Sequence, residues 1–579
     1  MNAAILARSV AAAVLLTTIL NACGGGSGSG PPPPNRSPTL VRSAADQRLV
    51  TGHTFRYDAS LGGTAVSDPD GDRLIYSVRV SWGSWGYALP PGLSLSGTVI
   101  SGVPSETGWT EIDVQVDDGR GGDTAEYRFL LRVVANSAPV VANPNVPRLT
   151  ANGAFVYLDA AQNGTTFTEP DGDAMDYAVT LRGDPHGLAI SGTHVSGTFD
   201  AVVGAVEVVI SASDPYGAVT SDSFLVAAPA PEPSATPNLP ATSYTYRDED
   251  LPLPLVFRES SESFNPLADG QPADNRTTNE GATLGRVLFY DKRLSITNTH
   301  ACASCHEQSR GFASGLRFNT GVLGIPLKRN AMALGNARYN AHLAWFSDMR
   351  ATGDLRNLIF MPIDNHDELG MALFSVESKL KNVSFYPALF TDAFGTPDIT
   401  RERIAAALAQ FVQSLISYQS KSDLAINSMT NDPAIPEAVF TAQEMQGFKI
   451  YTGSGHCAIC HERRANTNVL PANNGLDAIP TDPGTQVLAL SQGLIGVFRA
   501  ASLRNIAMSG PYMHDGRFST LREVIDHYDH GVQDSPNVNP ILGDLNLTEE
   551  DKDALEAFLN TLTDNIFLSD PKFSDPFAP

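Results

Sequence analysis

Two short motifs limit what this chain can fold into. Both read Cys-x-x-Cys-His, as CASCH at residues 302–306 and CAICH at residues 457–461. In this arrangement two thiols can bond covalently to the edge of a haem while the adjacent imidazole is placed under the iron. A zinc site or a thiol redox pair could use the same cysteines, but zinc sites seldom carry a following histidine twice, and no βαβ pattern surrounds either motif. We therefore predict two c-type haems, held by Cys302, Cys305, His306, Cys457, Cys460 and His461.

The remaining cysteine, Cys23, closes an N-terminal segment that predicts export. The chain begins MNAAILARSVAAAVLLTTILNAC, an apolar run too short for a comfortable membrane-spanning helix. Residues 20–23, LNAC, resemble the lipobox of bacterial lipoproteins, which implies a signal peptide at residues 1–22 and a lipid on the Cys23 sulfur. The alternative is a plain secretory signal. With no later transmembrane pattern, lipid would be the only anchor, on the periplasmic side of a bacterial membrane, and we expect an outer-membrane lipoprotein.

The charge of the chain excludes several classes of partner. The 579 residues include 39 lysines and arginines against 63 aspartates and glutamates, a formal charge of −24. This balance argues against nucleic acid and against docking on an anionic membrane surface. The length predicts three or four domains at roughly 150 residues each.

An internal repeat predicts two β-sandwich modules. The sequence DPDGDRLIYSV at residue 68 recurs as EPDGDAMDYAV at residue 169, a distance typical of one immunoglobulin-like unit of roughly 100 residues. Residues 89–108, LPPGLSLSGTVISGVPSETG, also resemble the immunoglobulin-like and cadherin-like modules of bacterial surface proteins, which implies spacer or docking modules. We expect a Gly/Pro-rich linker at 23–38, module 1 at 39–135 and module 2 at 136–228.

Two groups of side chains in these modules have alternative interpretations. The acidic turns could bind calcium, but Asp-Pro-Asp-Gly is also favourable turn chemistry, and we favour the turn. The tryptophans are expected in the core or at the edge of a sandwich. The acidic residues are Asp68, Asp70, Asp72, Glu169, Asp171 and Asp173, and the tryptophans are Trp82, Trp85 and Trp109.

After a Pro-rich linker at 229–248 the pattern becomes helical. Residues 399–419 and 547–564 have helical periodicity, and Thr548 with Asp551 predicts a capping box. We expect an N-terminal haem c domain at 249–430 and a C-terminal haem c domain at 431–579. The predicted fold is therefore multidomain, with two all-β immunoglobulin-like sandwiches followed by a mainly α-helical, two-domain di-haem c-type cytochrome.

Four stretches of the helical half resemble one enzyme family. They are GRVLFYDKRLSITNTHACASCHEQSRGFA, KRNAMALGNARYNAHLAWFSDMRA, MPIDNHDELGM and ASLRNIAMSGPYMHDGRFSTLREVIDHYDHG. Together they resemble the bacterial di-haem cytochrome c peroxidase family, which includes MauG, over about residues 252–564. The resemblance implies that hydrogen peroxide reacts at the haem of His306 and that the haem of His461 stores or relays an electron.

The resemblance also implies a catalytic carboxylate. In the family a glutamate in a P-x5-E-x-G context lies over the reactive iron, and Pro362 with Glu368 match it. Heterolysis of peroxide needs a base that moves a proton from one oxygen to the other. The alternative is a helix cap at the surface.

The first haem is expected to be open to peroxide in the oxidised state. Peroxidases of the family often carry a histidine soon after the first motif that blocks the iron until the partner haem is reduced. Residues 307–330 contain no histidine. His342 lies further on and is expected to be an ordinary packed or surface residue.

The distal ligand of the second haem is expected to be Tyr528. It lies fourteen residues after His514, where electron-accepting peroxidases have methionine and MauG-like members have tyrosine. A phenolate stabilises oxidised iron and lowers its potential, whereas a thioether does the reverse. The alternative ligands are His527, His530, Met508 and Met513.

Two further assignments follow from the resemblance. Trp345 would relay electrons between the haems, although it stands two positions from the family's usual place, where Ser347 falls. A calcium ion between the haems would be bound by a side-chain amide and backbone carbonyls. The matching residues are Asn330, Ser509 and Pro511, with Ser509 standing where threonine is usual.

Three functions remain in competition. In the first, a small redox protein donates electrons and peroxide is reduced to water. In the second, as in MauG, electrons are withdrawn from aromatic residues of a partner protein. The third, from another class, is a non-catalytic electron-transfer or adhesion lipoprotein.

Overall fold

The computed structural model describes residues 34–253, 271–340, 345–428, 439–461, 471–485, 494–543 and 545–578. The signal peptide, Cys23 and His342 lie outside the described residues. The chain divides into two compact units, residues 1–137 and 138–579. In the described ranges no helix combines the length and apolar character needed to cross a bilayer.

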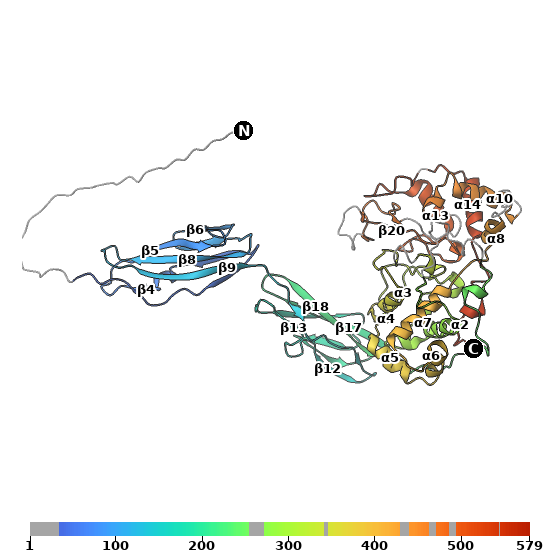
Figure 1. The fold of residues 1–579 in the computed structure, drawn as a ribbon, viewed down its shortest axis with the longest axis horizontal. Helices are drawn as coiled ribbons and strands as arrows, with labels where there is room; N and C mark the ends of the chain where they lie inside the picture. Colours follow the sequence, from blue (N-terminus) through green and yellow to red (C-terminus); the bar gives the residue numbers. More distant parts are fainter. Residues whose placement is uncertain are drawn as a thin grey trace, which may run out of the picture. The chain divides into compact units, whose positions relative to one another are not determined.

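The first unit contains a β-sandwich, module 1 (Figure 1). Its larger sheet has the order β2-β9-β8-β5, with β2 (Gln47–Val50), β9 (Ala125–Val134), β8 (Gly108–Asp117) and β5 (Ile75–Gly83). Its smaller sheet has the order β3-β7-β6, with β3 (Phe55–Asp58), β7 (Val99–Gly102) and β6 (Leu93–Ser96). A short pair is formed by β1 (Thr39–Leu40) and β4 (Val66–Ser67). Along β8, buried residues alternate with more exposed ones, because only one face packs on the core.

The second unit begins with module 2, which repeats this topology strand for strand. Its larger sheet has the order β11-β18-β17-β14, with β11 (Arg148–Leu149), β18 (Val219–Ala228), β17 (Gly204–Ser213) and β14 (Asp176–Arg182). Its smaller sheet has the order β12-β16-β15, with β12 (Phe155–Asp159), β16 (His194–Thr198) and β15 (Leu188–Ser191). The short pair is β10 (Val140–Val141) with β13 (Phe167–Thr168). The prediction of two all-β modules is confirmed.

Module 2 differs from module 1 in that its larger sheet is buried on both faces at one end. Val206 and Val226 pack into the module's own core, whereas Ala205, Leu225 and Ala227 pack into the core of the helical region that follows. The segment after β18 also lies along that region: the Ala230 amide donates to the Thr297 carbonyl at 2.8 Å, and the Asn238 amide to the Pro576 carbonyl at 2.7 Å. The exact domain boundaries stay predictions.

The rest of the second unit is mainly helical, as predicted, and falls into two halves. The first helical half contains α2 (Asn279–Tyr290), α3 (Leu355–Leu358), α4 (Phe360–Asp364), α5 (Leu373–Lys381), α6 (Tyr386–Phe394) and α7 (Arg401–Ser414). The second contains α8 (Lys421–Ser428), α10 (Ala442–Thr452), α11 (Cys457–Cys460), α13 (Leu521–Asp526), α14 (Glu549–Asn560), β19 (Pro471–Ala472) and β20 (Phe498–Arg499). The C-terminal segment returns to the first half, where Phe567 and Phe573 join its core.

The two predicted helices are present. The pattern at 399–419 becomes α7, which begins after the N-cap Thr400. The pattern at 547–564 becomes α14, where Thr548 and Asp551 form the predicted capping box. The Asp551 amide donates to the Thr548 hydroxyl at 3.1 Å, and the Thr548 amide donates to the Asp551 carboxylate at 3.2 Å. These bonds satisfy amides that the first turn of a helix leaves without partners.

Each helical half is organised around a pair of helices that cross at a glycine. A Cβ on Gly285 of α2 would lie 2.0 Å from the Ala407 carbonyl oxygen of α7. A Cβ on Gly447 of α10 would lie 1.9 Å from the Ala554 carbonyl oxygen of α14. Because real side chains cannot approach a backbone so closely, glycine permits both crossings. In each half the Cys-x-x-Cys-His motif follows the first helix of the pair.

Candidate active site

The first motif lies in a tight turn that orients its histidine. Cys302 begins the short helix η4 (Cys302–Ser304), and the His306 amide donates to the Cys302 carbonyl at 3.1 Å. The His306 Nδ1 lies 2.9 Å from the carbonyl oxygen of Phe312, a fully buried residue. Since a carbonyl only accepts, Nδ1 must carry the proton, which leaves Nε2 with the lone pair that an iron ligand requires.

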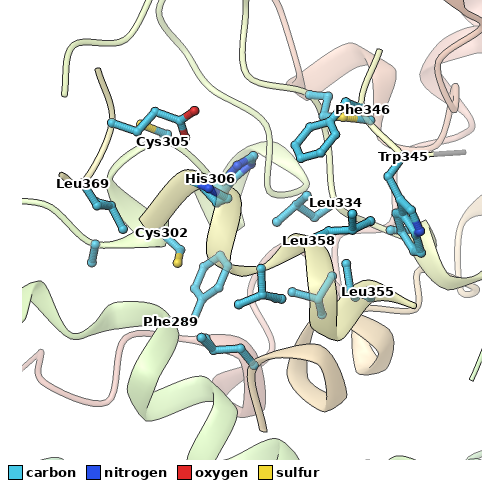
Figure 2. Close-up of a pocket in the computed structure, with 18 of the residues that line it drawn as sticks. Phe289, Cys302, Cys305, His306, Leu334, Trp345, Phe346, Leu355, Leu358 and Leu369 are labelled. Carbon is cyan, nitrogen blue, oxygen red and sulfur yellow. The ribbon is translucent and has the colours of Figure 1, made fainter. Parts of the chain in front are cut away.

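A cavity opens beside this motif, with about 1100 Å³ of space free of protein atoms, part of it open to solvent. Its walls are largely apolar and include Leu334, Leu358 and Phe346. Figure 2 shows Cys302, Cys305 and His306 toward one side of the pocket and Trp345 toward the other. The apolar walls, the two free thiols and the available imidazole nitrogen fit a covalently attached haem.

The environment of the two thiols argues against a thiol redox pair at this motif. Burial raises the pKa of Cys302 to about 12 and that of Cys305 to about 11, and the nearby charge of Glu368 adds to both shifts. A redox-active cysteine pair has lowered thiol pKa values, in an electropositive and partly exposed setting. The environment of this pair is the opposite, so it favours covalent attachment of a haem over thiol redox chemistry.

Glu368 lies in the wall of the same cavity, in a loop at residues 365–370 between α4 and α5. The Asn365 amide Nδ2 donates to Glu368 Oε1 at 2.8 Å. The Val322 amide donates to the Glu368 carbonyl at 2.9 Å. Burial raises the pKa of Glu368, although the Asn365 hydrogen bond and the Arg350 charge oppose the shift. The N-cap of α5 is Ala372, so Glu368 is not a helix cap.

Pro362 and Trp345 line the cavity together with Glu368. Trp345 is only 7% exposed, and its indole Nε1 donates to the Gly353 carbonyl at 2.7 Å. The structure therefore brings all three residues predicted as catalytic to one cavity.

Two lining residues were missed by sequence reasoning. Arg499 reaches the cavity from β20 in the second helical half, and its backbone amide donates to the Ser347 carbonyl at 2.8 Å. Burial lowers its pKa to about 10. A guanidinium in an apolar wall suits a carboxylate, such as the propionates that every haem carries. The other missed residue is Phe346, whose ring lies under the Arg350 guanidinium. Arg499 lies outside the four stretches that resemble the family, whereas Phe346 lies within one of them, directly after Trp345.

The second motif repeats the geometry of the first. The helix α11 spans its two cysteines, and the His461 amide donates to the Cys457 carbonyl at 2.9 Å. The His461 Nδ1 lies 2.8 Å from the Ala501 carbonyl oxygen, which again leaves Nε2 available. Burial raises the pKa of Cys457 to about 12 and lowers that of His461 to about 4. These residues fit a second covalently attached haem.

Tyr528 lies near the second motif, in a π-helical turn, η9 (His527–Gly531), that follows α13. Its hydroxyl accepts a hydrogen bond from Asn474 Nδ2 at 3.3 Å. Burial raises the pKa of the phenol, and charge on Cys457 and Cys460 would raise it further, so the phenol lies near this cysteine pair. Single π-turns inside helices frequently occur at functional sites.

The alternative ligands are less well placed. The His527 Nε2 lies 3.0 Å from the Asn474 carbonyl oxygen, and the His530 side chain is 66% exposed beside Asp529. Met508 is 41% exposed. Met513 lies close to Tyr528, because its sulfur accepts a hydrogen bond at 3.5 Å from the same Asn474 side-chain amide that donates to the Tyr528 hydroxyl.

The residues matched to calcium lie where the two halves meet. The Asn330 backbone amide donates to the His514 carbonyl at 2.8 Å, and its side-chain amide donates to the Leu316 carbonyl at 2.8 Å. Ser509 bonds to the Ile506 carbonyl at 3.3 Å, and Pro511 follows a cis peptide bond. Calcium binding at Asn330, Ser509 and Pro511 stays a prediction.

The acidic turn of module 1 is consistent with turn chemistry. Asp68 Oδ1 accepts from the backbone amides of Asp70 and Asp72 at 2.8 and 3.0 Å. Arg36 pairs with Asp70 at 2.7 Å, and Arg120 pairs with Asp72 at 2.9 Å. Arginine thus supplies positive charge beside these carboxylates.

Comparison with known proteins gives two families along the chain. A model described as di-haem cytochrome c peroxidase matches residues 279–431, and an Ig domain model matches residues 37–134 and 138–229. The methylamine utilization protein MauG of Methylorubrum extorquens is 34% identical over 300 residues, which cover 51% of this chain and 82% of MauG. The cytochrome c551 peroxidase of Nitrosomonas europaea is 29% identical over 306 residues, covering 52% of this chain and 83% of that protein.

A solved structure is also similar. A MauG-like protein associated with microbial copper homeostasis is 28% identical, with a TM-score of 0.49, and the match covers 55% of this chain and 100% of that one. The sequence match to MauG spans most of MauG's own length, and both Cys-x-x-Cys-His motifs are present. The chain therefore belongs to the family of MauG and the bacterial di-haem cytochrome c peroxidases, with two immunoglobulin-like modules before the enzyme region.

Proposed function

We propose that this protein reacts with hydrogen peroxide at the haem attached to Cys302 and Cys305 and ligated by His306. One observation carries the proposal: a single cavity contains this motif together with Glu368, Pro362 and Trp345. When bound, the haem supplies an iron that takes electrons in and gives them up singly. The chain's own residues hold the haem, exclude water and move protons.

Glu368 is the proton-transfer group in this proposal. Its carboxylate accepts a proton from one peroxide oxygen and returns it to the departing oxygen, so that the bond between them can break heterolytically. The Asn365 amide, 2.8 Å from Oε1, fixes the orientation of the carboxylate. The placement of Glu368 in the cavity wall also counts against a purely structural or adhesive protein.

The second haem, held by Cys457, Cys460 and His461, is proposed to relay electrons, with Tyr528 as its distal ligand. The burial of the phenol near this cysteine pair supports the assignment. A buried indole in the wall of the first cavity supports Trp345 as part of the electron path. Asn330, Ser509 and Pro511 are proposed to hold one calcium ion.

Two versions of the reaction differ in the source of the electrons. The peroxidase version takes them from a small redox protein. A MauG-like version takes them from aromatic residues of a partner protein, and Tyr528 with the histidine-free stretch at 307–330 favours it. In both versions we propose that the protein is exported and held on the periplasmic side of a membrane by a lipid on Cys23.

Stoichiometric peroxide distinguishes the two versions. One equivalent is added to the fully oxidised, full-length protein, and visible and near-infrared absorption are followed over time. A long-lived new spectrum without prior reduction would support an open first haem and direct the search to a partner protein. A reaction that starts only after one haem is reduced would support the donor-dependent peroxidase. No consumption of peroxide in either state would contradict the proposal.

A further inference from the structure

The loop that carries Glu368 is held from two sides. On one side the first helical half holds its backbone: the Val322 amide donates to the Glu368 carbonyl at 2.9 Å, and the Ile296 amide to the Leu369 carbonyl at 3.0 Å. On the other side, the residues next to Glu368 contact module 2. Because His366 and Asp367 directly precede Glu368, contacts to them bear on the position of its carboxylate.

The contacts with module 2 form a cluster of four charged or ionisable side chains. The His366 Nδ1 lies 2.8 Å from Glu207 Oε1. The Arg182 guanidinium donates to Asp367 Oδ1 at 2.7 Å and also bonds to Glu207. Arg182 in β14 and Glu207 in β17 are partners across the sheet, so the strand register places them side by side.

Glu207 is the centre of this cluster and is only 4% exposed. Burial alone would raise its pKa, but hydrogen bonds from His366 and Ser223 and the charge of Arg182 hold its pKa below the usual range. A buried, ionised carboxylate needs its hydrogen-bond and charge partners, because losing one leaves charge in the interior less well compensated. The same contacts therefore hold the partner side chains in place.

Apolar packing continues the same contact to the other end of the loop. A Cβ on Gly370 would lie 2.4 Å from Leu225 Cδ1 of β18, so module 2 packs directly against the loop backbone. Leu225 shares one core with Leu369 and Ile296 of the enzyme region. The loop is thus enclosed between module 2 and the first helical half.

The equivalent sheet face of module 1 carries different side chains around its glutamate. Glu111 is paired with Trp82 and Leu130 across its sheet, as Glu207 is with Arg182 and Leu225. Around Glu111 the tryptophans are exposed, Trp82 by 56% and Trp109 by 39%. Around Glu207 three neighbours on the sheet are buried: Ala205, Leu225 and Ala227.

We propose that module 2 is part of the active-site scaffold, with Arg182 and Glu207 as positioning residues that hold the Glu368 loop through Asp367 and His366. The inference rests on the proposed role of Glu368 in peroxide chemistry. It assigns module 2 a task that a spacer would not have, because the geometry of the proton-transfer group depends on a β-sheet outside the haem-binding fold.

Hydrogen exchange tests the positioning directly. The Glu368 and Gly370 amides both donate to the Asn365 carbonyl at 2.9 Å, so they report opening of the loop. In the full-length, haem-loaded protein, Arg182→Ala and Glu207→Ala should accelerate their exchange roughly tenfold, the effect expected for loss of one charge-assisted contact. The rate constant with peroxide should fall by a similar factor. Arg182 is partly exposed, so its variant tests the proposal even if Glu207→Ala fails to fold.

Two further variants separate positioning from general stability. Arg182→Lys keeps one positive charge and should recover part of both losses. Glu111→Ala removes the matched carboxylate of module 1, which pairs with Arg128 at 3.6 Å, and should change neither quantity. The haem absorption spectrum should stay the same throughout, since none of these residues lines the haem cavity.

The outcomes distinguish this inference from the proposed function. If Glu368→Gln alone leaves the peroxide rate unchanged, the role of Glu368 fails, whereas the exchange data still report on the loop. In a Glu368→Gln background, Arg182→Ala should speed exchange with no further loss of rate. Unchanged exchange in both Arg182→Ala and Glu207→Ala, or faster exchange at an unchanged peroxide rate, would overturn the inference.

Discussion

The two helical halves present the Cys-x-x-Cys-His motif in the same way and differ in the side chain that lies near it. Each has a helix pair crossing at a glycine, and each fixes its motif histidine by a bond from Nδ1 to a backbone carbonyl. In the first half an acidic side chain, Glu368, lines the cavity. In the second half the phenol of Tyr528 lies near the cysteine pair. In the proposed function the shared scaffold sets where a haem is held, and Glu368 or Tyr528 sets what that haem can do.

The contacts that hold Tyr528 and Glu368 in place also differ. Tyr528 lies in a π-helical turn within its own half, with Asn474 as its hydrogen-bond partner. Glu368 lies in a loop whose neighbours are held by another module. The supports of Tyr528 therefore come from one helical half, whereas the loop of the proposed peroxide site is held by both the first helical half and module 2.

The largest expected effect comes from removing the feature unique to the first half. Glu368→Gln keeps the size and the hydrogen-bonding ability of the side chain but cannot accept a proton. The peroxide reaction should slow by about two to four orders of magnitude, typical of lost general acid-base catalysis, with both haems still bound. Stopped-flow absorbance measures the rate. A full-speed variant would mean that the carboxylate is not the base.

The second half is tested by making its distal residue resemble that of the electron-accepting peroxidases. Tyr528→Met should raise the potential of the second haem, because a thioether stabilises reduced iron. We expect a rise on the order of 0.1 V, within the roughly 0.8 V that axial ligands span. Spectroelectrochemical titration measures it, with His530→Ala as an exposed control. An unchanged spectrum and potential would remove Tyr528 from the ligand set.

The pH dependence of the peroxide reaction should report the protonation of the Glu368 carboxylate in the first half. Burial raises the pKa of Glu368 above the usual glutamate value of about 4.3, and a base works only when deprotonated. The peroxide rate should be constant at high pH and fall about tenfold per pH unit below this pKa. The fall should begin at higher pH in Arg350→Ala, since Arg350 lowers the pKa, and should be absent in Glu368→Gln. Arg403→Ala is the control.

The smallest expected effect comes from the glycine at each helix crossing, which is a feature that both halves share. Gly447→Ala and Gly285→Ala each place a Cβ within about 2 Å of a carbonyl oxygen of the crossing helix. Overpacking of this kind should lower the free energy of unfolding by about 1–3 kcal/mol in each half. Denaturant unfolding followed by haem absorbance measures both variants. Lys449→Ala, on the exposed side of α10, should change stability by less than about 0.5 kcal/mol. Unequal losses would show that the two crossings are not equivalent.

Much of the site could be predicted because its signals are local. The two Cys-x-x-Cys-His motifs, the capping box of Thr548 and the 68/169 repeat each lie within a few consecutive residues, whose spacing fixes their geometry. Glu368 is indicated by the resemblance of a short stretch to the family's P-x5-E-x-G context. Arg499 was missed because it reaches the cavity from β20 of the second helical half, and Phe346 because no pattern assigns a role to the residue after Trp345.

The sequence by itself determined the cofactor class and the order of β and helical regions, and it predicted the residues that would hold each haem, because covalent attachment and hydrogen-bonded turns depend on near neighbours. Only the tertiary structure decided that module 2 packs on the Glu368 loop. Glu207 and His366 are 159 positions apart, and Glu111 stands at the matching place in module 1 with a different environment. Whether a carboxylate on a sheet faces solvent or a partner depends on what packs there, and that is a property of the assembled fold.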